Sequence, residues 1–361
     1  MDRGGLPGSA RTTPSLPALT GIRAIAAYAV FIHHYNPASA GTFLHQFLNQ
    51  GYIGVSVFFV LSGFLIQYRY ANRVLTNQVW SWRTYARNRF ARVYPLYAVV
   101  LASTATGVWL MGRPMDGAVL GLDLFLIQGF FDDYKFSGIQ QSWTLTVEAC
   151  FYALAPLLFV ALQRWGWLLL TAGLTGLGVL LWAVLNGTGW HLHGLFGKLP
   201  FVLFYTFLGR VFEFIIGMCL AQHWSQGRLT RPRFATAIGL LFMGICISWQ
   251  AYITGNSNDT NLLTGSEFIV YNYLLPVGIA LFFAGLLGEK TRIRNLLGHP
   301  FLQALGHSSY AFYLIHIGIL SRLIQKTGLV NSKWLLFGVL LILAHGLYLW
   351  VEKPLQRYLR N

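Results

Sequence analysis

Ten apolar segments, each close to the length of a membrane-crossing helix, follow one another along this 361-residue chain. A helix needs about 20 apolar residues to cross the bilayer core, and lipid admits only helices or closed barrels, because their backbone groups are paired internally. The segments predict an all-α integral membrane protein, a bundle of about ten transmembrane helices around a central cavity. They are 18–36, 51–68, 93–112, 143–163, 165–186, 200–222, 234–253, 266–288, 301–322 and 334–351.

The composition supports a membrane protein over a soluble one. Charged residues make up 10% of the chain and hydrophobic residues 55%, whereas a soluble domain carries about 25% charged residues. The net charge of +15 would suit a nucleic-acid binder, but such a protein would not be this apolar. Excess Lys and Arg on the cytoplasmic side explains the charge. We therefore expect a lipid bilayer as partner and no nucleic acid.

The basic residues also predict an orientation. With the N-terminus in the cytoplasm, the inside segments hold 18 of the 26 Lys and Arg and the outside segments hold 6. This asymmetry predicts a multi-pass protein of the cell (inner) membrane with both termini cytoplasmic. The expected domains are a disordered N-terminus (1–17), one transmembrane domain (18–353) and a C-terminal tail (354–361). The apolar stretch 120–131 is too short to cross, so we expect an interfacial or re-entrant piece on the outer side.

The first span, within IRAIAAYAVFIHHYN (22–36), contains ionisable residues that are costly in lipid. Arg23 and His34 are eleven residues apart, almost three helical turns, so they share a face with about 16 Å of rise between them. His33 is rotated by about 100° from that face. The spacing therefore selects His34 as the histidine that faces a cavity. The alternative is that the histidine pair only ends the helix in the headgroup layer.

An arginine-rich segment, SWRTYARNRFARVYP (81–95), precedes the third span. Arg89 and Arg92 have i, i+3 spacing and share a helix face. We expect an interfacial helix here, with Pro95 at the head of the next span, where its missing N–H matters least. Guanidinium groups suit phosphate because they donate in a planar fork. Contact with lipid headgroups, or positive-inside sorting alone, is the competing interpretation.

Other ionisable residues fall within later spans. Glu148 is either a partner for a histidine or arginine or a structural hydrogen-bond acceptor. Arg210 and Glu213 have the spacing of an ion pair within one helix. No metal site is expected, because His191 and His193 lack an evident third ligand, and the three cysteines form no CxxC. In SSYAFYLIH, His316 could line the same cavity, with Tyr310 and Tyr313 on adjoining turns.

Six motifs in order resemble acyltransferase family 3, membrane enzymes that O-acetylate sugars, polysaccharides, lipids and antibiotics. The resemblance covers Leu19 to about Leu355. It departs where Thr20 and Ser56 stand, since many members carry Asp at both places. The matched segments are LTGIRAIAAYAVFIHH, GYIGVSVFFVLSGFLI (51–66), RFARVYPLY (89–97), WTLTVEACFY (143–152), GHSSYAFYLIH (306–316) and VEKP (351–354). In these segments the motif residues of the family correspond to Arg23, His34, Arg89, Arg92, Pro95 and Glu148.

The resemblance implies acyl transfer from acyl-CoA, most often acetyl-CoA, as a cytoplasmic co-substrate, with no cofactor bound permanently. The acceptor would be a hydroxyl of a sugar, polysaccharide, glycolipid or small molecule. His34 would be catalytic, as general base or acyl carrier, and Glu148 would orient its imidazole or bind the acceptor. Donor-binding candidates are Arg23, Arg69, Arg89 and Arg92, with Arg83 an alternative to Arg69; cavity or acceptor candidates are Ser309, Tyr310, Tyr313 and His316.

A transporter or flippase is the competing class. Transporters also keep charged residues near the membrane midplane, often within internal repeats and broken helices. The two halves of this sequence show no convincing repeat. A structural or sensor protein would leave the arginine and histidine constellation without a role.

Overall fold

The computed structural model describes residues 16–76, 80–113, 115–189, 192–229, 233–256, 260–326, 328 and 332–360, with the backbone alone for 260–263. This part of the chain is helical and contains no strand, only an isolated bridge between Phe131 and Leu195. Most of the predicted N-terminal segment 1–17 lies outside the described residues. The first helices are α1 (Pro17–His34), α2 (Phe43–Asn49), α3 (Ile53–Ile66), α4 (Asn72–Leu75), α5 (Trp82–Leu110), α6 (Gly117–Leu124) and α7 (Trp143–Gly187).

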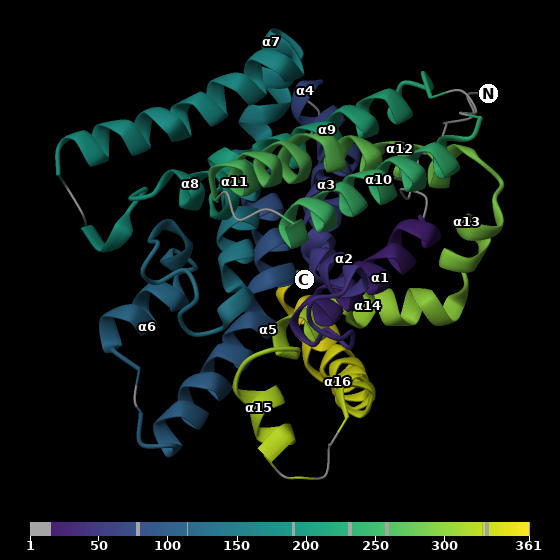
Figure 1. The fold of residues 1–361 in the computed structure, drawn as a ribbon. Coiled ribbons are helices and arrows are strands. Elements are labelled where there is room, and N and C mark those ends of the chain that lie inside the picture. The colour runs from purple at the N-terminus through teal and green to yellow at the C-terminus, as the bar shows by residue number, and fades with distance from the viewer. Residues whose placement is uncertain are drawn as a thin grey trace, which may run out of the picture.

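The remaining helices complete a bundle in which the last ones return to the first (Figure 1). Short π-helical turns at Gln67–Ala71 and Tyr348–Glu352 continue α3 and α16 toward the next helix. The helices are α8 (Leu199–Tyr205), α9 (Phe207–Ser225), α10 (Ala235–Asn256), α11 (Thr260–Ile269), α12 (Leu275–Gly288), α13 (Arg292–Leu297), α14 (Pro300–Ile315), α15 (Ile319–Lys326), α16 (Lys333–Leu347) and α17 (Lys353–Arg360).

Within the described ranges, seven helical stretches are long and apolar enough to cross a membrane. The expected count of about ten is not confirmed. Two of the predicted spans fall on the single helix α7, and two others fall on α1 and α14. The arginine and two histidines of α1 lower its mean hydropathy, and the 16 residues of α14 are fewer than the roughly 20 that a crossing requires.

Helix α7 bends at Gly166, and the two halves run in different directions (Figure 1). Gly166 has φ 76°, a left-handed conformation that favours glycine because it has no Cβ. Leu168 and Leu169, just after the bend, are more than 60% exposed. Large aliphatic side chains exposed in this way are suited to lipid, so the bend accounts for two predicted spans in one helix.

Helix α5 is continuous from Trp82 to Leu110, which differs from the predicted interfacial helix followed by a separate span. Its N-terminus is capped by Ser81, whose Oγ accepts from the Thr84 N–H at 3.3 Å. Pro95 lies inside this helix rather than at its head. Proline removes one backbone hydrogen bond, and the flanking turns of α5 stay helical without it. Arg89 and Arg92 are thus rigidly joined to the membrane-crossing part of α5.

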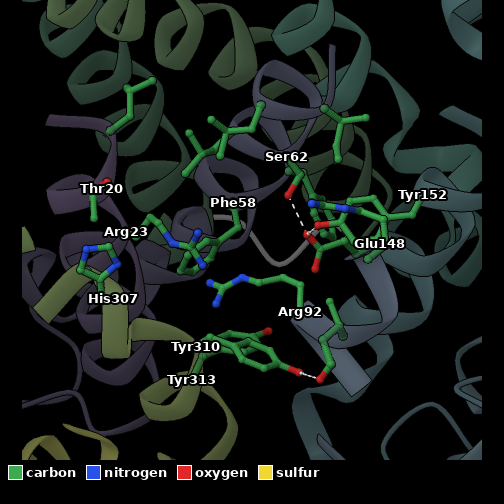
Figure 2. A pocket seen from close by; sticks show the side chains of 18 of the residues that line it. Thr20, Arg23, Phe58, Ser62, Arg92, Glu148, Tyr152, His307, Tyr310 and Tyr313 are labelled. Carbon is green, nitrogen blue, oxygen red and sulfur yellow. Dashed lines mark hydrogen bonds between the residues drawn. The ribbon is translucent and has the colours of Figure 1, made fainter. Parts of the chain in front are cut away.

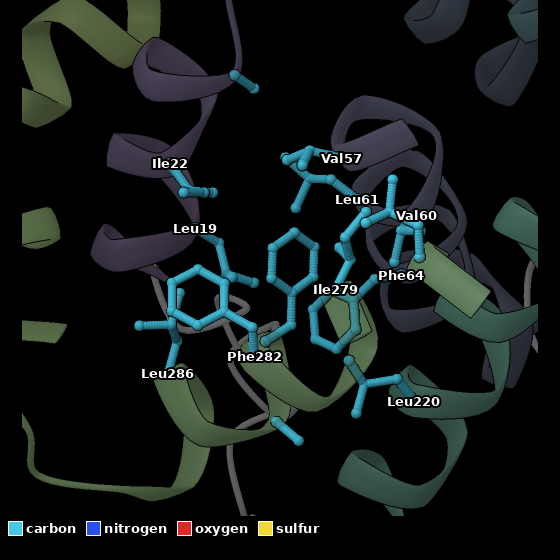
Figure 3. Close-up of a cluster of buried hydrophobic side chains, with 14 of the residues drawn as sticks. Leu19, Ile22, Val57, Val60, Leu61, Phe64, Leu220, Ile279, Phe282 and Leu286 are labelled. Carbon is cyan, nitrogen blue, oxygen red and sulfur yellow. The ribbon is translucent and has the colours of Figure 1, made fainter. Parts of the chain in front are cut away.

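Helix α1 is held between an apolar cluster and α14. Leu19, Ile22 and Ala26 share a face of α1 and pack into the cluster with α3, α9 and α12 (Figure 3). On the side toward α14, a Cβ on Gly306 would stand 2.0 Å from the Thr20 carbonyl oxygen, so only glycine permits this close crossing. The arrangement leaves the face of α1 that carries Arg23 directed at the bundle interior.

The apolar stretch 120–131 divides into the end of α6 and a single 3₁₀ turn at Gln128–Phe130. The eight residues of α6 span about 12 Å, far short of a bilayer core of about 30 Å. Tyr97 anchors this connection to α5 by donating to the Asp123 carbonyl at 2.7 Å. Its side remains a prediction, since the structure contains no membrane.

Candidate active site

A cavity of about 500 Å³ opens between α1, α3, α5, α7, α14 and the C-terminal helix. Five arginines line it, against one lining carboxylate, Glu148. Figure 2 shows the guanidinium groups of Arg23 and Arg92 converging in this space, with Glu148 on the far side. The arginines are Arg23, Arg69, Arg89, Arg92 and Arg360. All four residues predicted to bind the donor therefore meet in one cavity, although they come from three separate segments.

The arginines are oriented by different partners. Arg89 donates to the Tyr70 hydroxyl at 3.2 Å, and its guanidinium lies over the rings of Tyr70 and Tyr152. Its buried Nε has no hydrogen-bond partner among the described residues. Arg92 forms an ion pair with Glu352, which is 1% exposed. Arg89 therefore keeps a donor available for a cavity ligand, while Arg92 is already neutralised.

Arg23 is placed at the side of the cavity formed by α1 and α14. Its Nε lies 3.5 Å from the Oγ of Ser309, which is fully buried on α14. This weak contact joins α1 to α14. It leaves the rest of the Arg23 guanidinium facing the cavity (Figure 2). Thr20, where many members of the resembling family carry a carboxylate, also lines the cavity. Among the described residues, no carboxylate forms an ion pair with Arg23, so its guanidinium is available to a bound anion.

Glu148 is held by two hydroxyl groups on the cavity wall. Ser62 donates to its Oε1 at 2.7 Å, and Tyr152, one turn further along α7, donates to the same oxygen. Both bonds hold the carboxylate in place on the cavity wall. Because they converge on Oε1, the second oxygen is available to the contents of the cavity. Among the described residues, Glu148 makes no contact with His34.

His34 does not line the cavity. It is the last residue of α1, its side chain is exposed, and no hydrogen bond is formed by its ring within the described part of the chain. Its ring lies 5.3 Å from the ring of His316 and 4.7 Å from that of His33. His33 instead contacts the Asn49 carbonyl through Nδ1 at 2.5 Å. The two histidines thus have different neighbours, but neither lines the cavity, so the prediction that His34 faces the cavity together with Arg23 is not confirmed.

Tyr313 connects the cavity wall to the histidines, and Phe58 packs beside it. Both line the cavity, and their rings are 5.9 Å apart. The Tyr313 hydroxyl is hydrogen-bonded to Thr144 at 3.0 Å, and the Tyr313 ring lies 5.5 Å from the ring of His316. His316 is fully buried and does not line the cavity. Tyr313 therefore contacts both the arginine-lined space and the buried imidazole of His316.

Of the four residues proposed to line a cavity or bind the acceptor, Tyr310 and Tyr313 lie on the cavity wall. Tyr310 donates to the Val93 carbonyl at 2.7 Å, and the Arg92 guanidinium lies over its ring. Ser309 and His316 are buried on or next to the same helix, behind this wall. The motif from Ser309 to His316 thus divides between cavity-facing and buried positions.

The ion pair expected within one helix is confirmed. Arg210 and Glu213 are fully buried on α9, with nitrogen to oxygen distances of 2.7 and 2.8 Å. Arg210 also donates to Ser56 at 3.2 Å. Ser56 stands where many members of the resembling family carry Asp, so Glu213 supplies from α9 the carboxylate that α3 lacks. This pair does not reach the cavity.

The sequence analysis did not select the C-terminal residues of the site. Gln356 and Arg360, which we assigned to a tail, belong to α17 and line the cavity. Gln356 donates to Glu352 at 2.9 Å. The VEKP motif, which contains Glu352, is the sequence feature that points to this part of the site. The spacing of Lys353, Arg357 and Arg360 is that of one face of a helix, and these residues lie on α17.

A second polar cluster lies away from the cavity, where the connections before α7 and before α8 meet. Asp132 forms ion pairs with Lys135 and with Lys198, the latter at 3.0 Å. Burial opposes ionisation of this carboxyl, but the two ammonium groups hold its pKa below the ordinary value. Tyr134 is hydrogen-bonded to His193 at 2.9 Å. His191 lies outside the described residues, and the cluster joins two loops without forming a cavity.

Comparison with known proteins agrees with the motifs. The family model described as "Acyltransferase domain" matches residues 16–351. A Bacillus subtilis protein named "Putative peptidoglycan O-acetyltransferase YrhL" is 27% identical over 94% of this chain and 55% of its own length. A Staphylococcus aureus protein named "Putative O-acetyltransferase SACOL0978" is 24% identical over 85% of this chain and 51% of its own.

A Streptomyces mycarofaciens protein named "Acyltransferase MdmB" is 27% identical over 84% of this chain and 79% of its own length. The chain thus spans about half the length of the first two relatives and most of the third. No solved structure matches the chain. The family match extends from α1 through α16 and so includes the histidine pair and every cavity-lining helix except α17, and the chain belongs to acyltransferase family 3.

Proposed function

We propose that this protein is an integral membrane O-acyltransferase of the cell (inner) membrane. It takes an acyl group, acetyl in the first place, from acyl-CoA on the cytoplasmic side and transfers it to a hydroxyl of a carbohydrate, glycolipid or other envelope-associated acceptor. The observation that carries this proposal is the arginine-lined cavity, one wall of which is Tyr313, whose ring also contacts His316 of the histidine group.

The cavity suits the donor because CoA is a polyanion with a long, thin arm. Arg69, Arg89 and Arg360 would contact the nucleotide phosphates, since Arg89 has a spare donor and no carboxylate partner among the described residues. A ligand phosphate would compete with Glu352 for Arg92. The pantetheine arm would then extend past Arg23 toward Phe58 and Tyr313.

The chemistry is assigned to His34. In the transfer step the acceptor oxygen attacks the thioester carbonyl carbon, the C–S bond breaks, and the hydroxyl proton passes to an imidazole nitrogen and then to the CoA thiolate. A neutral imidazole can accept this proton near neutral pH. In this proposal the Tyr313 ring moves aside to admit the thioester, because Tyr313 lines the cavity and also packs against His316, the neighbour of His34.

Glu148 is assigned to the wall of the donor cavity rather than to the imidazole. Its Oε1 is bonded to Ser62 and Tyr152, and Figure 2 shows the carboxylate facing the arginines. It would hold the acyl-bearing arm in place by accepting hydrogen bonds from the amide N–H groups of pantetheine. An acceptor would approach from the exposed face of His34, opposite to the donor.

The acceptor class is supported by one relative that is named as a peptidoglycan O-acetyltransferase. The test is turnover by the purified full chain in nanodiscs, given acetyl-CoA and soluble peptidoglycan fragments, with thiol release and acetyl-ester formation measured together. We expect ester formation to match thiol release. Unchanged acetyl-CoA in the presence of all hydroxyl acceptors tried, together with transport activity in vesicles, would favour the transporter alternative.

The same assay separates the two roles left open for His34. Rapid quenching of the first turnover detects an acyl-imidazole as a burst of thiol release without ester. We propose the general-base route, for which thiol and ester appear together. A burst equal to the enzyme concentration would replace it with the acyl-carrier route.

A further inference from the structure

His316 is a buried imidazole with one unused nitrogen. It caps the C-terminus of α14, is fully buried, and contacts the Tyr313 carbonyl through Nδ1 at 2.7 Å. Its Nε2 has no hydrogen-bond partner among the described residues. A buried polar atom left unpaired costs free energy, so such an atom in a native fold calls for an explanation.

The Tyr313 contact determines which nitrogen of His316 carries hydrogen. A carbonyl oxygen only accepts hydrogen bonds, so Nδ1 must be the N–H. In the neutral ring, Nε2 then presents a bare lone pair. Full burial disfavours the charged ring. His316 therefore offers one acceptor in a fixed position at the end of α14.

His34 is the neighbour that can donate to this acceptor. Around His316, Phe312 is apolar, and the Tyr313 hydroxyl is already bonded to Thr144. His33 is held at the Asn49 carbonyl. The His34 ring packs at 5.3 Å from His316 and has no hydrogen bond of its own within the described ranges.

We infer that His316 is a positioning residue for His34, its Nε2 accepting a hydrogen bond from one ring N–H of His34 in the substrate-loaded enzyme. The contact rests on the proposed function and deepens it. It fixes the tautomer of His34, so that the other ring nitrogen is a bare base directed at the acceptor hydroxyl. A carboxylate orients the histidine of a catalytic triad in the same way, but a neutral imidazole does so without burying a charge.

A neutral orienting group also explains why the histidines and Glu148 are kept apart. A carboxylate at the fully buried position of His316 would have to be desolvated without an ion-pair partner, which is costly. The ring of His316 is accommodated between Phe312 and Tyr313 instead. Hydrogen bonds in unliganded sites are often long and tighten on substrate binding, and the exposed His34 ring is free to turn toward Nε2.

The test compares His316→Phe, which keeps a ring but removes the acceptor, with His316→Gln, which retains an amide oxygen. A His345→Phe variant on α16 is the matched control for histidine replacement in the same membrane domain. We expect kcat to fall roughly 100-fold in His316→Phe, less than the loss of a triad carboxylate, and about 10-fold in His316→Gln. The KM for acetyl-CoA is expected to stay unchanged in both.

A second readout does not depend on turnover. Nitrogen NMR of ¹⁵N-histidine-labelled protein in nanodiscs, with the His34 signal assigned by its loss in His34→Phe, reports the tautomer of each ring. We expect a single His34 tautomer in the wild type loaded with CoA and a mixture in His316→Phe. Wild-type protein that fails to consume acetyl-CoA refutes the proposed function, while the spectra still test the contact.

Two outcomes would overturn the inference. One is a folded His316→Phe variant with wild-type kcat. The other is a wild-type spectrum in which His316 carries its hydrogen on Nε2, or in which His34 populates both tautomers in the CoA-loaded protein. If His316→Phe does not fold, His316→Gln and the wild-type spectrum decide the question.

Discussion

The two ends of α1 carry polar groups in opposite ways. At the Arg23 end, a cavity of about 500 Å³ gathers charged side chains from helices distant in the sequence. At the His34 end, neutral rings pack within 4.7 to 5.5 Å of one another, and His34 and His316 do not line the cavity. About 16 Å of helix rise separates the ends. The arginines therefore gather around a cavity that a ligand can enter, while the rings of His33, His34 and His316 contact one another outside it.

In the proposed function, this difference corresponds to a division between donor binding and reaction. A permanent charge in an apolar bundle is costly unless it is paired or hydrated, and the cavity provides both Glu352 for Arg92 and open space for Arg89. An imidazole pays no such cost while it is neutral, so it can stand at a tightly packed position. The rings of Phe58 and Tyr313 pack together on the cavity wall, and Tyr313 is in contact with both environments.

The largest expected effect is at the histidine end. His34→Ala removes the proposed proton acceptor, and we expect turnover of acetyl-CoA to fall at least roughly 1000-fold, within the range for losing a general base. His33→Ala is the control, because the one hydrogen bond of the His33 ring goes to the Asn49 carbonyl, and it should lose less than about 10-fold. Equal losses in both, at equal expression, would show that the helix end and not one imidazole matters.

The next effect is at the arginine end. Arg89→Gln removes a charged donor that has no carboxylate partner among the described residues. We expect the KM for acetyl-CoA to rise roughly 10- to 100-fold, the value of one or two charge-assisted hydrogen bonds, with little change in kcat. Arg83→Gln, on the exposed part of the same helix, should leave KM unchanged. A lowered kcat at constant KM would move Arg89 from binding to catalysis.

A smaller effect is expected where the two regions meet. Phe58→Ala removes the cavity-lining ring that packs against Tyr313 and so enlarges the cavity there. We expect the ratio of kcat/KM for butyryl-CoA to that for acetyl-CoA to rise about 10-fold, since added methylenes gain room. Phe64→Ala removes the same ring from α3 at a position that does not line the cavity. An unchanged ratio in Phe58→Ala would mean that acyl groups do not pass this point.

The smallest effect concerns the connection between α5 and α7, which contains α6 and packs against the histidine end of α1. Leu126 and Ile139 of this connection share an apolar cluster with Phe31 of α1. Burial raises the pKa of Asp123 to about 6 from 3.8. The folded state therefore holds this proton more tightly than the unfolded state, and the stability from it is complete below 3.8 and is lost as pH rises to about 6.

Asp123→Asn should therefore flatten the dependence of Tm on pH between about 4 and 6 without changing the KM for acetyl-CoA. Asp116→Asn is the control, because Asp116 caps α6 from an exposed position and Asn caps equally well. A pH profile unchanged by Asp123→Asn would assign the dependence to another group.

Local patterns in the sequence predicted the parts of the site that depend on one helix. The i, i+3 spacing of Arg210 and Glu213 predicted their ion pair, which is confirmed, whereas the eleven-residue spacing that favoured His34 over His33 did not place His34 on the cavity wall. The points where helices begin, bend and end could not be predicted in this way. Pro95 lies inside a continuous helix, and α7 combines two predicted spans, because tertiary packing overrides local signals of helix ends.

The sequence alone determined the all-helical membrane character, the family and the identity of the arginines and histidines, since apolar length, charge placement and motif order are all local properties. Only the tertiary structure decided that α17 closes the cavity, that Glu352 neutralises Arg92, and that His316 lies beside His34 and not beside Glu148. These contacts join residues up to 282 positions apart, and such distances depend on how helices cross, which no spacing along the chain encodes.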